Sequence, residues 1–159
     1  MKFITVLPLF LFLSLSFQIK AQHFSVNDLV EIRAMDISDA STYFEKKKWK
    51  LYQTRKNPDT STEIFWTKGE APITMFRYIL THDPANSAVS VMFGDKSNFE
   101  SMKKEVKKLG MQQTGSGVDE QGQIYSIYTS PDYQLRFSTS SDKKMTYYQV
   151  FLIVNPSKS

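Results

Sequence analysis

The feature that most constrains the fold is a pair of similar stretches 60 positions apart. Residues 45–54 align with residues 105–114, so that Glu45 matches Glu105 (105 − 45 = 60). Three later segments match at spacings of 60, 59 and 61, namely 63–65 with 123–125, 76–78 with 135–137, and 89–91 with 150–152. The alternative is chance similarity between two amphipathic halves, since identities are few. The repeated order of the segments favours two copies of one structural unit.

A helix is predicted at residues 97–110, in the second copy. Ser97 and Glu100 have the S-x-x-E spacing of a capping box, which satisfies two free backbone donors. Gly110 is placed to end the helix in the left-handed conformation. The apolar residues fall on one face and lysines on the other; the apolar set is Phe99, Met102, Val106 and Leu109.

Two helices are predicted in the first copy. Ser25 is the expected N-cap of the first, which ends at Met35-Asp36. Asp36 or Ser38 begins the second, which continues to about Lys48 with Ile37, Ala40 and Phe44 directed inward. The three lysines at 46–48 are interpreted as a solvated helix end, where the dipole favours cations. A basic binding patch is the alternative.

Strand periodicity and turn residues predict four strands in each copy. These cover residues 50–54, 63–67, 73–80, 88–93, 111–114, 123–129, 133–138 and 146–154, with residues 115–117 expected as a loop. The segments at 63–67 and 123–129 do not sort clearly into two faces. The predicted fold class is α+β: two tandem helix-plus-four-strand units forming one antiparallel sheet of about eight strands, with the helices on one face.

The first 21 residues are predicted to be a cleavable signal peptide. A basic start precedes an apolar run shorter than the roughly 20 residues that a membrane span needs. We therefore expect a periplasmic or secreted protein, with units at residues 22–95 and 96–159 in one compact domain. Oligomeric state is left open.

Composition argues against several classes of function. Without Lys2 and Lys20 the chain has 18 basic and 16 acidic residues, a balance of +2, which does not favour nucleic-acid binding. There is no cysteine and therefore no disulfide, so stability must come from burial. The 12 Phe, 8 Tyr and 2 Trp of the whole chain make this possible, because aromatic side chains bury large areas.

The order of elements resembles that of the secreted β-lactamase inhibitor proteins, in which tandem helix-plus-four-strand units build one sheet whose bare face grips an enzyme. The resemblance covers most of the chain after residue 21, but the disulfides of that family are absent here. No contact residue of the family can be transferred, so inhibition is implied only by analogy. The chain also resembles small exported proteins of Gram-negative cell envelopes, a resemblance that implies no particular chemistry.

The sequence predicts no catalytic residue, metal site or cofactor. Its two histidines are His23, next to the expected cleavage point, and His82, next to an Asp-Pro turn. Two separated histidines do not form a zinc set, and no G-x-S-x-G motif is present. The carboxylates at 119, 120 and 132 do not follow a calcium-loop pattern.

The remaining candidate is the face of the sheet that the helices leave open. Strand alternation places seven residues of interface-forming types there: Tyr52, Met75, Arg77, Met92, Arg136, Tyr147 and Phe151. We expect a non-catalytic binding module that holds a protein or peptide on this face. The plainer interpretation is a solvated face whose arginines pair with nearby carboxylates. The alternative function is a small-ligand carrier or hydrolase of the cell envelope, with a pocket between helices and sheet.

Overall fold

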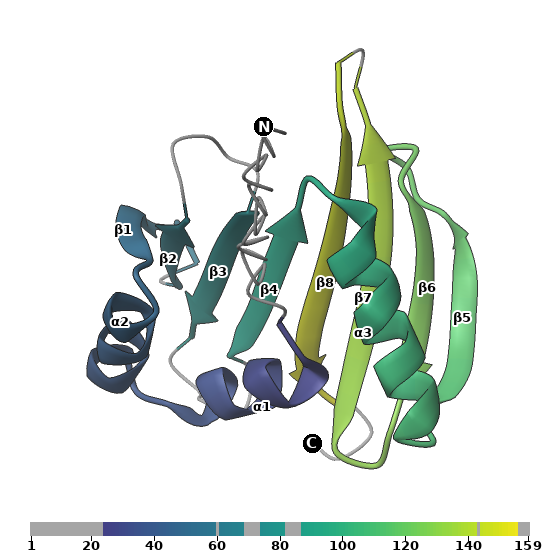
Figure 1. The fold of residues 1–159 in the computed structure, drawn as a ribbon, viewed down its shortest axis with the longest axis horizontal. Coiled ribbons are helices and arrows are strands. Elements are labelled where there is room, and N and C mark those ends of the chain that lie inside the picture. Colours follow the sequence, from purple (N-terminus) through teal and green to yellow (C-terminus); the bar gives the residue numbers. More distant parts are fainter. Residues whose placement is uncertain (1–23, 60, 69–73, 82–86, 143, 156–159) are drawn as a thin grey trace, which may run out of the picture.

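The computed structural model describes residues 24–59, 61–68, 74–81, 87–142 and 144–155 of the 159-residue chain. Over these ranges the protein is an α+β fold with three helices and one antiparallel eight-stranded sheet. The helices lie on the near side of the sheet in Figure 1. The expected signal peptide, His23 and His82 lie outside the described residues.

The two short helices of the N-terminal half begin where their capping residues predict. Helix α1 covers Val26–Ala34, and the Ser25 hydroxyl accepts a hydrogen bond from the backbone N–H of Asp28 at 3.0 Å. Helix α2 covers Ile37–Lys46, with Asp36 as its N-cap. Ala40 and Phe44 are buried as predicted.

Helix α3 covers Lys96–Lys108, and both of its ends differ in part from the prediction. Its N-cap is Asp95, whose carboxylate accepts from the backbone N–H groups of Ser97 and Asn98, so the predicted Ser97–Glu100 capping box is wrong. Gly110 is left-handed as predicted, with φ of 71°. Leu109 is 52% exposed because it follows the last helical residue and leaves the buried face.

The strands form one sheet in the order β1-β2-β3-β4-β8-β7-β6-β5, with every neighbouring pair antiparallel. Their bounds are β1 Lys50–Lys56, β2 Thr62–Thr67, β3 Thr74–Leu80, β4 Ala88–Phe93, β5 Gln112–Val118, β6 Ile124–Thr129, β7 Tyr133–Ser141 and β8 Thr146–Val154. Strands β4 and β8 join the N-terminal and C-terminal strands at the centre (Figure 1). The edges are β1 and β5.

The hydrophobic core lies between the sheet and the three helices. Phe44 of α2 stacks on Trp66 of β2 with ring centroids 4.5 Å apart. Phe99 of α3 meets the edge of Phe137 on β7 at 5.5 Å. The Glu105 carboxylate on α3 accepts from the backbone N–H of Val26 at 2.9 Å, which ties the start of α1 to α3. The helices therefore cover one face of the sheet.

Both edge strands carry an irregularity that opposes further strand pairing. The register shifts between Leu51 and Gln53 on β1, and between Gln113 and Gly115 on β5. The expected loop at residues 115–117 is instead part of β5, because pairing with β6 gives this segment its backbone hydrogen bonds. A Cβ atom at Gly117 would lie 3.2 Å from the Tyr125 hydroxyl, so glycine allows the tyrosine side chain to lie against β5.

Candidate functional site: the open face of the sheet

We use the name open face for the side of the sheet opposite the helices. Strand alternation and register place six of the seven predicted residues on it: Met75, Arg77, Met92, Arg136, Tyr147 and Phe151. All six are partly exposed. The seventh, Tyr52, lies in the bulge of edge strand β1 and is 64% exposed.

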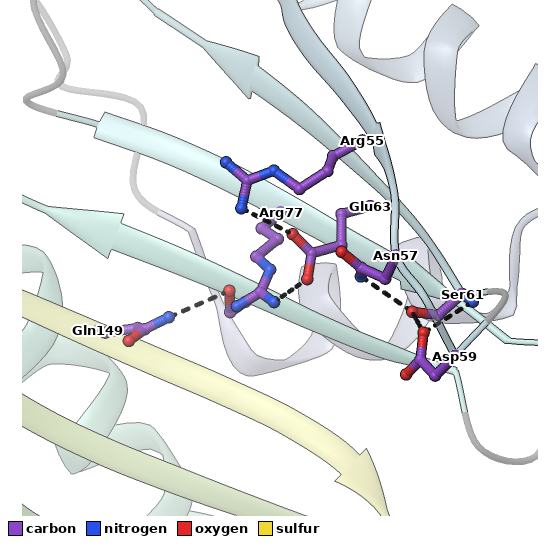
Figure 2. Close-up of polar contacts among 8 residues, drawn as sticks. Arg55, Asn57, Asp59, Ser61, Glu63, Arg77 and Gln149 are labelled. Carbon is purple, nitrogen blue, oxygen red and sulfur yellow. Dashed lines mark hydrogen bonds and ion pairs between the residues drawn. The ribbon is translucent and has the colours of Figure 1, made fainter.

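A continuous row of directly paired residues crosses the centre of the open face. In sheet order it reads Gln53, Phe65, Arg77, Ser90, Phe151, Arg136, Ile127 and Gly115. Ser90 is only 2% exposed, so this small residue forms the floor between Arg77 and Phe151. The Gln149 amide donates to the Ser90 hydroxyl at 3.3 Å (Figure 2). The two arginines are thus placed on either side of the central pair of strands.

Arg77 is paired with a buried carboxylate on the neighbouring strand. Its guanidinium donates to Glu63, and Arg55 approaches the other Glu63 oxygen at 3.9 Å (Figure 2). The Glu63 side chain is 9% exposed. Burial alone would raise the pKa of Glu63, but hydrogen bonds from Arg77 and Asn57 and the charges of Arg77 and Arg55 lower this pKa below its ordinary value.

Arg136 is paired with a carboxylate in a turn. It donates to Asp119, in the β5–β6 turn, at 2.5 Å. Its guanidinium carbon lies 4.5 Å from the ring centroid of Tyr125. The plainer interpretation is therefore correct for the charges: Arg77 and Arg136 are each paired with a carboxylate, and Arg55, which lies on the same face, shares Glu63 with Arg77.

Several partly exposed residues of the open face are not among the seven predicted binding residues, although alternation already places Ile79 and Ile153 on this face. They are Phe65, Ile79, Tyr125, Ile127 and Ile153, which share strand parity with the predicted set. Strict alternation along β2 and β6 would have found three of them. Buried Glu63 had no such signal, because only the pairing of β1, β2 and β3 surrounds it with arginines.

A separate hollow of about 620 Å³ lies on the helix side of the sheet, at the junction of α1 and α2. Its lining is largely apolar and includes Ala34, Met35, Ile37 and Leu80. The Tyr78 hydroxyl donates to the backbone carbonyl of Met35 at 3.1 Å and fixes this junction against β3. The hollow is large enough for a small organic molecule.

Comparison with known protein families, curated proteins and solved structures finds no match to this chain. Within the ranges that the structure describes, no three His, Cys, Asp or Glu side chains are grouped so that they could hold a metal ion. None of the helices in these ranges has the length and apolar character needed to span a membrane.

Proposed function

We propose that the chain is an exported, non-catalytic binding module that holds a protein or peptide partner on the open face. The observation that carries the proposal is the cover of large, partly exposed side chains on the side of the sheet without helices. Aromatic residues, Met and Arg are the types enriched where protein interfaces are buried. Because Arg77 and Arg136 are already ion-paired, contact area rather than free positive charge would supply the affinity.

The proposal includes a duplication, for which the local geometry gives support at a spacing of 62. Lys48 and Gly110 are both left-handed (110 − 48 = 62). The backbone N–H of Trp49 donates to Phe44, and that of Met111 donates to Val106, with the same spacing. The alignment of residues 45–54 with 105–114, at a spacing of 60, pairs Trp49 with Leu109. These two side chains differ in burial, because Trp49 is 3% exposed and Leu109 is 52% exposed. A spacing of 62 aligns Trp49 with partly buried Met111 instead.

The central strand pair is consistent with a two-fold relation between the proposed copies. Ser90 pairs with Phe151, and the flanking pairs are Val89 with Leu152 and Val91 with Val150. With a spacing of 61, Val89 corresponds to Val150 and Val91 corresponds to Leu152 (150 − 89 = 61). The pair Val89–Leu152 therefore becomes the pair Val150–Val91 when the two copies are exchanged. Arg77 and Arg136, which pair with Ser90 and Phe151, would then be equivalent.

The two arginines are held by different partners in the proposed copies. If Arg77 and Arg136 are equivalent, so are their strand neighbours Phe65 and Ile127, which gives a spacing of 62 here in place of the 60 matched in the sequence (127 − 65 = 62). The position equivalent to Glu63 is then Tyr125, whose ring lies against Arg136 (125 − 63 = 62). The position equivalent to Asn57 is Asp119, which supplies the carboxylate for Arg136. An arginine is thus kept in place although its carboxylate comes from a strand in one half and a turn in the other.

The test is affinity capture from an extract of the cell envelope with immobilised chain from residue 22 onward, read by mass spectrometry. The double variant Phe151→Ser with Met92→Ser removes large side chains from the open face. The matched control, Leu109→Ser with Met145→Ser, removes side chains that are 52% and 41% exposed elsewhere. We expect partner recovery to fall about tenfold, equivalent to about 1.4 kcal/mol, only in the face variant. Equal recovery by both variants, each checked for folding, would reject the open face as the site.

A second candidate function, that of a small-ligand carrier, is favoured by the hollow at the α1–α2 junction. Ala34 is exposed and lines this hollow, so Ala34→Trp would fill it without disturbing the core. Glu31→Trp, at an exposed position of the same helix outside the lining, is the control. The carrier function predicts that the neutral fluorophore N-phenyl-1-naphthylamine brightens with the native chain and the control but not with Ala34→Trp.

A further inference from the structure

A second hollow, of about 400 Å³, lies on the open face beside the β5–β6 turn. Tyr125 and Ile127 provide an apolar wall, and Glu120 and Arg136 provide charge. Tyr125 and Ile127 are partly exposed, so this apolar wall is accessible to a partner. The hollow therefore combines an apolar lining with charged groups at one end of the proposed binding surface.

The turn that forms this hollow is braced by Asp119. One oxygen of its carboxylate accepts from the backbone N–H groups of Gln121 at 3.1 Å and Gln123 at 2.9 Å. The other oxygen accepts from Arg136 at 2.5 Å. Gly122 adopts a left-handed φ of 77°, and its backbone N–H donates to the Asp119 carbonyl at 2.9 Å. A hollow formed in advance reduces the ordering cost of binding.

The charges around the hollow do not balance. Asp119 and Arg136 neutralise each other, which leaves the Glu120 carboxylate. Glu120 is exposed and forms no ion pair with another described residue. Two carboxylates against one guanidinium give the hollow one net negative charge, so it attracts cations and repels carboxylates.

We infer that this hollow receives a lysine or arginine side chain of the protein partner. Such side chains have an apolar stem and a cationic head. The stem would pack on Tyr125 and Ile127, and the head would reach Glu120. This inference rests on the proposed function and adds to it the chemistry of one contact residue on the partner.

The test is an NMR titration of the ¹⁵N-labelled chain from residue 22 onward, which contains every described helix and strand, with N-acetyl-lysine-methylamide. We expect saturable shifts in the backbone amides of Gly117, Gln121 and Gly122, with a dissociation constant in the millimolar range, as suits a single side chain. N-acetyl-norleucine-methylamide has a similar stem without the charge and should shift these amides much less.

Two variants complete the test. Glu120→Gln, at an exposed position, should abolish the saturable shifts, whereas Glu31→Gln on α1 should retain them. Equal shifts with both compounds, shifts centred elsewhere, or the absence of saturable shifts would each overturn the inference. The two proposals can fail separately. If the NMR test fails but capture still depends on Phe151 and Met92, the proposed function stands and only the lysine site is rejected. If the NMR test succeeds but capture does not depend on Phe151 and Met92, the hollow binds lysine and the proposed function is rejected.

Discussion

At the scale of single residues, Glu63 is the most deeply buried charge among the described residues of the open face. A carboxylate that is 9% exposed on a strand is tolerated because Arg77 donates to it and Arg55 lies 3.9 Å away. Asp119 is 19% exposed and accepts two backbone N–H groups besides Arg136. The Glu63 carboxylate therefore depends more on its arginine for hydrogen bonds than the Asp119 carboxylate does.

Replacing Arg77 should destabilise the protein more than replacing Arg136. Arg77→Met leaves a mostly buried carboxylate without its main donor, which we expect to lower the free energy of unfolding by about 1–2 kcal/mol. Arg136→Met should cost clearly less, because Asp119 keeps its two backbone donors. Urea denaturation of both variants at neutral pH measures the difference. An equal loss of unfolding free energy in the two variants would show that the Glu63 carboxylate does not need Arg77 to be stable in its buried position.

The stabilising effect of Glu63 should disappear in acid. The pKa of Glu63 is lowered in the folded state from an ordinary value of 4.5, so the unfolded chain binds the proton more readily. The contribution is complete above that ordinary value and is lost as the pH falls through the lower folded-state pKa. Denaturation of native protein and Glu63→Gln across this range should show a stability difference that shrinks with decreasing pH. A constant difference would contradict this origin.

At the scale of elements, helix ends are set by the residues that flank them. Helix α3 begins after Asp95, whose extended backbone lets its carboxylate reach the N–H groups of Ser97 and Asn98. The Ser97 hydroxyl donates to the same carboxylate at 2.6 Å and plays a supporting role. At the other ends of α2 and α3, Lys48 and Gly110 both have positive φ, although only glycine adopts it without cost.

Asp95→Ala should therefore destabilise α3 more than Ser97→Ala. Loss of the N-cap carboxylate should lower the free energy of unfolding by about 1 kcal/mol. Ser97→Ala keeps the Asp95 bonds to the backbone and should cost only a few tenths of that, on the order of 0.3 kcal/mol. Thermal or urea unfolding followed by circular dichroism compares them. A larger effect of Ser97→Ala would instead favour the capping box predicted from the sequence.

At the scale of the whole molecule, the eight strands form one continuous hydrogen-bonded sheet. The β4–β8 ladder connects the strands of the N-terminal half to those of the C-terminal half. Buried Val89 and Leu152 face each other across this junction. The two halves share one core and should unfold together.

This cooperativity can be measured because both tryptophans, Trp49 and Trp66, lie in the N-terminal half. Leu152→Ala on β8 should lower the free energy of unfolding by about 3 kcal/mol, because Leu152 is fully buried. Tryptophan fluorescence should report this loss with the same midpoint as circular dichroism, although the change lies in the other half. Separate midpoints would mean that the halves unfold independently.

The sequence by itself determined most of the helices and strands, and the inward faces of those whose apolar spacing is regular. Alternation along β8 and the helical spacing of Phe99, Met102 and Val106 are local periodicities, and the fully buried residues follow them. On central strand β4, Ala88 and Ser90 of the open face are buried as well. Cysteine content and the types of residue on the open face were also visible without coordinates. These properties depend on the sequence within a few residues of each position.

Only the tertiary structure decided which distant groups meet. Pairing with β6 makes a strand of Gly115-Ser116-Gly117, and the pairing of β1, β2 and β3 surrounds Glu63 with Arg55 and Arg77. The hollow beside Glu120 exists because Asp119 reaches Arg136 on β7. Such contacts join residues far apart in the chain, so the register of the whole sheet, not local propensity, determines them.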